Sequence, residues 1–321
     1  MKSCRLRDEP NVLPIMSDTR TSRFDLLATL AALGALACWS AGPIFIKYLA
    51  GYIDSWTQNF LRYAVALVFW LPFCIYSFRR PIIDARIWKV ALIPAAANVV
   101  MQCFWALSFY YIEPAFMNLL IKSSLIWIAV FSIIFFADER PLVRSPQFWT
   151  GLALSIIGVC GVLFSRQDFA EKRTAAGIVI TLIAAFMWAV YNVAVKIAFR
   201  KYDSRSSFAV VTVYTTAALA VLGFLVGDFR QSLEMSPWQW ACVVISGVVS
   251  IALSHVFFYT AIKRIGATIP SMALLASPFL VLLGSYLVFG EVLTVLQIVF
   301  GSVLLGGSAL AIWAQEQLRR N

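Results

Sequence analysis

The residues that could do chemistry in this chain are few, and they lie inside long apolar segments. Lys122 stands about a third of the way along such a segment, and Asn118 lies one turn away on the same face of a helix. A cation at that depth costs at least about 2.5–3.5 kcal/mol on insertion scales, so Lys122 is expected to face protein or water. It could attract a carboxylate or another anionic group of a substrate. The alternative is a structural lysine bound to backbone carbonyls or to the loop that carries Glu113.

A second set combines the only histidine, His255, with aromatic and amide side chains. His255 can change its charge near neutral pH and could bind substrate or relay a proton, although a lone histidine in a packed bundle is more often a neutral hydrogen-bonding residue. Helical spacing would bring further residues to the same cavity: Trp39, Gln102, Trp105, Trp188, Tyr191, Asn192 and Tyr259. Together they predict an aromatic-rich pocket for an amphipathic or aromatic metabolite. The alternative for each aromatic residue is packing in the bundle or anchoring at the membrane interface.

Other charged residues lie nearer the ends of the apolar segments. Lys47 and Lys196 are interpreted as structural, because long side chains there can reach the interface. Glu139 and Glu291 are expected to make contacts at helix ends or in loops, and Arg62, about two turns into its segment, is intermediate.

The sequence lacks the residues that several kinds of chemistry require. The sequence contains no GxxxxGK[ST] phosphate loop, no CxxC spacing among its six cysteines, and no Asp or Glu deep inside an apolar segment. We therefore expect no metal, no cofactor and no enzyme. A membrane-embedded lipid-modifying enzyme is a remote alternative, since it would need a cluster of acid, base or metal-binding groups.

The composition makes lipid the solvent for most of the chain. Of the 321 residues, 61% are hydrophobic and 13% are charged, whereas soluble domains carry roughly 25% charged residues. Ten segments are long enough to cross a bilayer: 26–48, 56–77, 88–110, 114–136, 147–165, 175–199, 208–227, 237–260, 266–289 and 294–314. The expected fold class is an all-α membrane protein with ten transmembrane helices.

The two sets of five segments repeat one pattern. Four residues of the first set recur in the second at one constant spacing; the pairs are Trp39 and Trp188, Lys47 and Lys196, Asp54 and Asp203, and Ser55 and Ser204. Two more pairs, Ala115 and Ala267 and Glu139 and Glu291, have a slightly larger spacing. A unit with an odd number of spans that occurs twice must sit in the membrane in opposite orientations. This predicts two inverted five-helix repeats, 26–165 and 175–314, between a disordered cytoplasmic tail, 1–25, and a short cytoplasmic tail, 315–321.

The cations outside the segments lie mostly on one side. Lysines and arginines concentrate in the N-terminal tail, at the C-terminus and in alternate loops, as at Arg79–Arg80 and Arg200–Lys201, while the opposite loops hold Arg166, Lys172, Arg173 and Arg230. By the positive-inside rule both termini are cytoplasmic, in a multi-pass protein of the inner (plasma) membrane. Because these cations are scattered over short loops, nucleic acid is not expected as a partner.

The repeated motifs resemble those of a known family. They are Cys38-Trp39-Ser40 with its echo Met187-Trp188-Ala189, the ends Ala137-Asp138-Glu139-Arg140 and Phe289-Gly290-Glu291-Val292, and the glycine-rich fifth and tenth segments. Over about 26–314 the chain resembles EamA-type members of the drug/metabolite transporter superfamily. It departs from the pattern at Ile126, the counterpart of Pro278, which puts the kink expected in the fourth segment in doubt.

The resemblance implies a ten-helix transporter with a central cavity between the repeats. Members of this superfamily move amino acids, other metabolites, drugs or nucleotide sugars, and EamA-type members are often exporters. We expect a secondary transporter that exports small metabolites, such as amino acids or related zwitterions and anions, by alternating access. The alternatives are an uptake permease and a multidrug efflux protein. The expected partners are the small-molecule substrate and the lipid bilayer. The glycines of the fifth and tenth segments would allow close packing inside the bundle or a homodimer.

Overall fold

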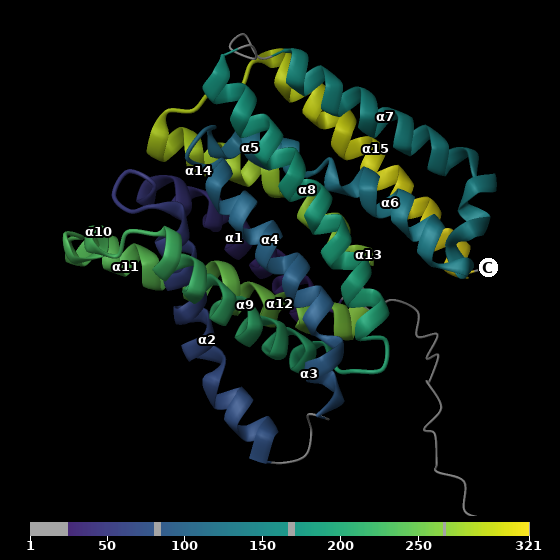
Figure 1. Cartoon of the computed structure of the whole chain (residues 1–321). Helices are drawn as coiled ribbons and strands as arrows, with labels where there is room; N and C mark the ends of the chain where they lie inside the picture. The colour runs from purple at the N-terminus through teal and green to yellow at the C-terminus, as the bar shows by residue number, and fades with distance from the viewer. Residues whose placement is uncertain (1–24, 80–84, 166–170, 266–267, 321) are drawn as a thin grey trace, which may run out of the picture.

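The computed structural model describes residues 25–79, 85–165, 171–265 and 268–320, and every regular element within them is a helix (Figure 1). In this part of the chain, nine helices are long and apolar enough to cross a membrane, and Leu92–Ser108 is a shorter apolar helix. The prediction of an all-α membrane protein is confirmed. The expected N-terminal tail lies outside the described residues except for Asp25.

The elements follow the expected segments. The first half contains α1 (Leu26–Leu49), α2 (Ser55–Arg79), α3 (Arg86–Val90), α4 (Leu92–Ser108), α5 (Pro114–Ile121), α6 (Ser124–Phe135), a 3₁₀ helix (Ala137–Arg144) and α7 (Pro146–Phe164). The second half contains α8 (Lys172–Ala198), α9 (Ser204–Val226), α10 (Arg230–Leu233), α11 (Pro237–Ser246), a π-helix (Gly247–Leu253), α12 (Ser254–Ile265), α13 (Thr268–Ala273), a 3₁₀ turn (Leu274–Ala276), α14 (Ser277–Phe289) and α15 (Val295–Arg320). The last helix thus continues through most of the segment expected as a tail.

The repeated Asp–Ser pairs start two equivalent helices. Asp54 accepts hydrogen bonds from the backbone N–H groups of Trp56 and Thr57 at 2.9 and 3.0 Å, at the start of α2. Asp203 caps α9 in the same way. A side-chain acceptor at this position satisfies N–H groups that the first helical turn leaves without partners. The echo in the sequence therefore has a local structural cause.

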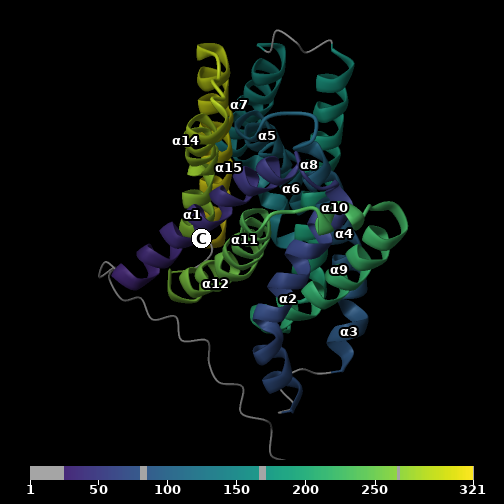
Figure 2. The same ribbon diagram turned by 90° about the vertical axis from the view of Figure 1, so that its left-hand side faces the viewer.

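Packing between the halves is mirrored. Helix α1 packs against α12 and α14 of the second half, and its counterpart α8 packs against α4 and α6 of the first. Helix α2 packs against its counterpart α9, and α7 packs against its counterpart α15. Figures 1 and 2 both show α7 and α15 side by side at one edge of the bundle. Equivalent helices thus make equivalent contacts across the molecule.

The glycines of α7 and α15 bring these two helices into close contact. A methyl group added at Gly151 would lie 2.6 Å from the carbonyl oxygen of Gly307, so a side chain there would force the helices apart. The hydroxyls of Ser155 and Ser308 are 3.2 Å apart across the same interface. These small residues serve packing within the bundle.

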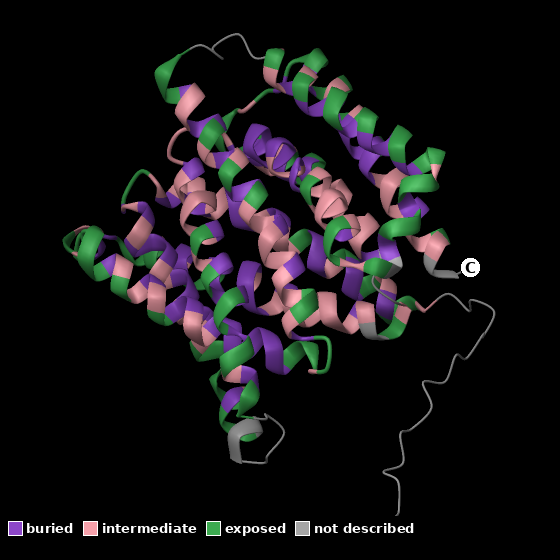
Figure 3. Cartoon of the chain, turned by 45° about the vertical axis from the view of Figure 1, so that its right-hand side comes forward, coloured by how far each residue is buried: buried purple, intermediate pink, exposed green. Residues whose placement is uncertain are grey.

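The outer faces of the helices are apolar. Figure 3 shows exposed residues along these faces and buried residues where the helices face one another. Among the exposed side chains are Phe164, Leu225 and Leu287, each more exposed than buried. Such a surface matches a hydrocarbon environment and would be unfavourable in water.

The fourth and ninth spans are broken at equivalent positions. Helix α5 ends at Ile121 and α6 begins at Ser124, while the 3₁₀ turn Leu274–Ala276 separates α13 from α14. In the fourth span the backbone tightens around Ser123, since Leu125 and Ile126 donate to carbonyls three residues back. The α-helix is therefore interrupted here without a proline, and the expected kink itself stays a prediction.

Candidate functional site

A cavity of about 330 Å³ lies where α8, α9 and α12 converge, within the size range of small-molecule sites. Its lining is aromatic with two cations and several hydroxyls: Tyr191, Val195, Lys196, Phe199, Arg200, Tyr202, Ser204, Ser207, Phe208, Val211 and Tyr259. Arg200 and Ser204 are exposed, so the cavity opens to the surface at this end. All of these residues belong to the second half, whereas the sequence analysis places the site between the halves.

Aromatic rings from three helices form a cluster that we call the aromatic wall: Trp39, Phe208, His255 and Tyr259. Phe208 and Tyr259 line the cavity, and Trp39 and His255 pack against them. The imidazole of His255 stacks on Phe208, with ring centroids 3.8 Å apart, and the ring of Trp39 meets it edge-on at 5.2 Å. Tyr259 lies 6.0 Å from Phe208. Through Trp39 on α1, the first half contacts this aromatic cluster.

His255 is held by its own helix. Its Nδ1 lies 2.6 Å from the carbonyl oxygen of Ile251, which can only accept, so Nδ1 donates and carries a proton. This bond fixes the ring orientation and leaves Nε2 as the nitrogen that could meet a substrate. Phe208 gave no signal in the sequence, because a phenylalanine inside an apolar helix does not differ from a packing residue.

Three candidates lie together on α8. Tyr191 lines the cavity, and the ring of Trp188 lies 5.7 Å from it. The side-chain amide of Asn192 donates to the carbonyl of Trp188 at 2.7 Å, so its N–H group is partly committed to its own helix. Of these three, Tyr191 is the residue placed to touch a ligand.

Lys122 and Asn118 form a separate group at the helix breaks. The ammonium group of Lys122 donates to the carbonyl oxygen of Leu274 at 3.2 Å, and the amide oxygen of Asn118 accepts from Ser277 at 3.1 Å. Pro278 has no N–H, so the carbonyl of Leu274, four residues earlier, lacks its α-helical donor and accepts instead from the backbone N–H of Ser277. The ammonium group of Lys122 is a second donor to the same carbonyl. This is the contact that the structural alternative predicts, and a role in substrate binding stays a prediction.

Gln102 and Trp105 form a third group on α4, opposite α2. The side-chain amide of Asn59 donates to the backbone carbonyl of Gln102 at 3.1 Å, and the guanidinium of Arg62 lies 5.9 Å from the ring centroid of Trp105. The ten candidates thus divide among the aromatic wall and its α8 neighbours, the helix breaks, and the α2–α4 contact.

An ion pair lies at the open end of the cavity. Lys196 pairs with Glu139, which also accepts from the side-chain amide of Gln315. The Lys196 ammonium is 3.6 Å from the ring centroid of Phe136. Lys196, expected to reach the interface, therefore joins α8 to the 3₁₀ helix and to α15 beside the cavity.

The repeat-related residues Lys47 and Glu291 hold the opposite end. Glu291, between α14 and α15, accepts from the backbone N–H groups of Ala115 and Phe116 at 2.9 and 3.0 Å. Lys47 donates to the carbonyls of Phe109 and Ile112 at 3.0 and 3.1 Å. Burial raises the pKa of the Glu291 carboxyl, and the hydrogen bonds from Ser285 and the two backbone N–H groups oppose this. Both residues fasten the segment that joins α4 to α5.

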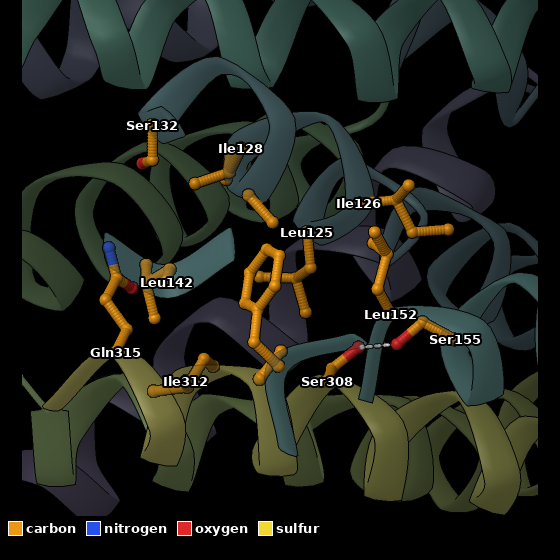
Figure 4. Close-up of a pocket in the computed structure, with 13 residues that line it drawn as sticks. Leu125, Ile126, Ile128, Ser132, Leu142, Leu152, Ser155, Ser308, Ile312 and Gln315 are labelled. Carbon is orange, nitrogen blue, oxygen red and sulfur yellow. Dashed lines mark hydrogen bonds between the residues drawn. The ribbon is translucent and has the colours of Figure 1, made fainter. Parts of the chain in front are cut away.

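A second cavity of about 40 Å³ lies between α6, α7 and α15 (Figure 4). Its lining is mostly aliphatic, with Ser155 and Ser308 hydrogen-bonded at one side and Gln315 at the other. It has room for little more than water. The larger cavity is therefore the candidate substrate site.

An apolar bundle of helices with an aromatic cavity at one end is the architecture of a multi-pass membrane protein with room for a small molecule. The EamA-like transporter family matches residues 26–164 and 175–313, which is most of the chain. The chain belongs to this family, of the drug/metabolite transporter superfamily, and is a transporter rather than an enzyme.

Individual relatives agree with this assignment. The chain is 25% identical to an uncharacterized transporter of Haemophilus influenzae over 67% of this chain and 69% of that protein. It is 24% identical to the uncharacterized inner membrane transporter YhbE of Escherichia coli K12 over 69% of each chain. One crystal structure of a protein matches with a TM-score of 0.61 and 19% identity, over 88% of this chain and 96% of that one. The last comparison supports the fold alone.

Proposed function

We propose that this chain is a secondary transporter that exports small organic metabolites, amino acids or related zwitterions and anions, through the cavity beside Lys196. The observation that carries the proposal is the lining of that cavity, in which tyrosines and phenylalanines surround Lys196 and Arg200. Aromatic side chains favour a substrate with an apolar or aromatic part, and two cations favour an anionic group on it. The same cations disfavour organic cations as substrates.

The direction of export is supported by charge. The open end of the cavity lies at the connection between α8 and α9, which carries Arg200, Lys201 and Arg205. Basic loops lie on the cytoplasmic side, so the cavity would open to the cytoplasm, and both termini would lie on that side. A cavity in this position would receive metabolites made in the cell. The printed name of YhbE supports the inner membrane as the location.

Alternating access between two inverted repeats, 26–165 and 175–314, would carry the substrate across. The mirrored packing of α1 and α8 supports this arrangement, because related halves that exchange roles can produce two mirror-image states. Closure of the Lys196 end and release of the segment held by Lys47 and Glu291 would turn one state into the other.

The test compares metabolites released by cells that overproduce the wild type, Tyr259→Ala and Tyr286→Ala. Tyr259 lines the cavity, whereas Tyr286 is exposed on the outer face of α14 and is the matched control. Untargeted mass spectrometry of the medium should find a metabolite enriched by the wild type and by the control but not by Tyr259→Ala. Depletion of a metabolite from the medium would instead indicate uptake. Equal enrichment by all three would remove the cavity from the transport path.

A further inference from the structure

Arg62 is a buried cation without a buried anion. Its side chain on α2 is only 1% exposed. Its Nε donates to the hydroxyl of Ser246 at 2.5 Å, but Nη1 has no hydrogen-bond partner. Over the residues that the structure describes, no carboxylate lies within ion-pair distance of Arg62. A guanidinium removed from water is unfavourable unless an anion or a full set of acceptors compensates it.

Other polar groups near Arg62 also lack partners. The hydroxyl of Ser250 is buried and has no hydrogen-bond partner. Ser250 lies about one turn after Ser246, in the π-helix, so both hydroxyls belong to the helical run that faces α2. The amide oxygen of Asn59, one turn before Arg62 on α2, is likewise unpartnered. Two hydrogen-bond donors and one acceptor are thus left open in one region.

Four helices meet at this region. A methyl group at Gly42 on α1 would come within 3.2 Å of Ser250 Cβ and 3.8 Å of Trp105 on α4. A methyl group at Gly247 would lie 2.6 Å from the carbonyl oxygen of Arg62, so the π-helix backbone passes directly beside α2. A π-helix is a rare distortion that is frequent at functional sites, and Ser250 belongs to this one.

One helical run joins this region to the aromatic wall. None of its residues lines the large cavity, but the π-helix leads directly into the segment that carries His255. Ser254 donates to the carbonyl of Ser250 at 2.8 Å, and His255 Nδ1 donates to that of Ile251.

Lys122 contrasts with Arg62. The ammonium group of Lys122 already has the Leu274 carbonyl as a partner, whereas Arg62 keeps an open N–H group in a buried position. A guanidinium is also suited to bind both oxygens of a carboxylate.

We propose that Arg62 and Ser250 bind the carboxylate of the transported metabolite in an occluded state. Arg62 Nη1 and the Ser250 hydroxyl donate to the carboxylate, and Asn59 Oδ1 accepts from an ammonium group where the substrate is a zwitterion. This inference rests on the proposed transport function and names the chemical group that it recognises. A free inorganic anion such as chloride is the competing occupant with the same charge.

The test measures thermal unfolding of the purified full-length chain in detergent with acetate, phenylacetate, phenylacetamide or chloride. The variants are Arg62→Gln and Ser250→Ala, and the control is Arg230→Gln, which removes an exposed cation from α10. We expect at least one carboxylate to stabilise the wild type and the control, and phenylacetamide to have no effect. Ser250→Ala should weaken the apparent affinity about tenfold or more, and Arg62→Gln should abolish the stabilisation.

Three results would overturn the proposal. The first is that acetate or phenylacetate stabilises the wild type and Ser250→Ala equally. The second is that neither carboxylate stabilises the wild type. The third is that chloride gives an Arg62-dependent stabilisation as large as that of the carboxylates. Ser250→Ala keeps the test decisive if Arg62→Gln does not fold, because the Ser250 hydroxyl has no partner to lose. Arg62-dependent carboxylate binding without any export by the wild type would contradict the transport proposal and leave this site in place. Export that is unchanged in Ser250→Ala would contradict the role of this site and leave the transport proposal in place.

Discussion

The two ends of the bundle use equivalent residues in different ways. At one end Lys196 pairs with Glu139 beside an open cavity. At the other end Glu291 binds backbone N–H groups at the start of α5, and Lys47 binds carbonyls of the preceding turn. The residue types and repeat positions are the same, so the difference lies in how each end is closed. We interpret the Glu291 end as closed by backbone contacts and the Lys196 end as open.

This comparison links the repeats to a transport cycle. If the halves exchange roles, Glu139 would take a capping position at its own end when that end closes, and Glu291 would release α5.

Glu291→Ala should cause the largest loss of stability. It removes the acceptor of two backbone N–H bonds and of the Ser285 hydroxyl. Hydrogen bonds to charged groups contribute about 1.5–3 kcal/mol each at most, and water can replace part of them at a helix end. We expect a loss of about 2–3 kcal/mol in unfolding free energy, measured by denaturation in detergent. A loss no greater than that of Glu234→Ala, an exposed glutamate, would contradict this role.

Lys122→Ala should cost less and should depend on Pro278. Without the ammonium group the Leu274 carbonyl keeps only the backbone N–H of Ser277 as a donor, and the lost hydrogen bond contributes about 1 kcal/mol. Pro278→Ala supplies a backbone N–H that can take its place. The double variant should therefore be more stable than the sum of the two single changes predicts. Additive effects would mean that Lys122 does not serve the helix break.

Glu139→Gln should have a smaller effect than Glu291→Ala. The Lys196 side chain is 39% exposed, so it can turn to water when its partner is neutralised. We expect about 1 kcal/mol or less for the coupling between Glu139→Gln and Lys196→Gln in a double-mutant cycle. A coupling as large as the loss in Glu291→Ala would show that both ends are closed with equal strength.

The pH dependence of Glu291 should give the smallest effect. Burial raises the pKa of its carboxyl above the ordinary value of 4.5, so the folded chain takes up this proton more readily than the unfolded chain. The resulting stability is fully present below the unfolded pKa and is lost as the pH rises through the folded pKa. Denaturation across the weakly acidic range should therefore show wild type gaining stability relative to Glu291→Gln as the pH falls. A constant difference would reject this assignment.

The sequence predicts the helices well and their mutual contacts poorly. Apolar length is sufficient for the spans, and the Asp54 and Asp203 pairs mark two helix starts. The break at Ser123 could not be predicted from Ile126, because no proline marks that break in the fourth span. The isolation of Arg62 could not be predicted either, because it depends on contacts with Ser246 and Ser250, which are far away in the sequence.

The candidate site shows the same limit. Helical spacing gives the face of one helix on which His255 and Tyr259 lie, and these two do share the aromatic wall. It does not tell which face of a neighbour meets them. Lys122 was expected in the same pocket, but its contact is with the broken ninth span. Phe208 joins the wall only because α9 packs across α12 at that point.

Cysteine labelling can determine the side of the membrane to which the cavity opens. In a chain whose six cysteines are replaced, Ser204→Cys places one thiol at the open end of the cavity. A membrane-impermeant maleimide should label it in inside-out vesicles and leave it unlabelled in intact cells. Labelling in intact cells but not in inside-out vesicles would place the open cavity on the outer face and contradict loading from the cytoplasm.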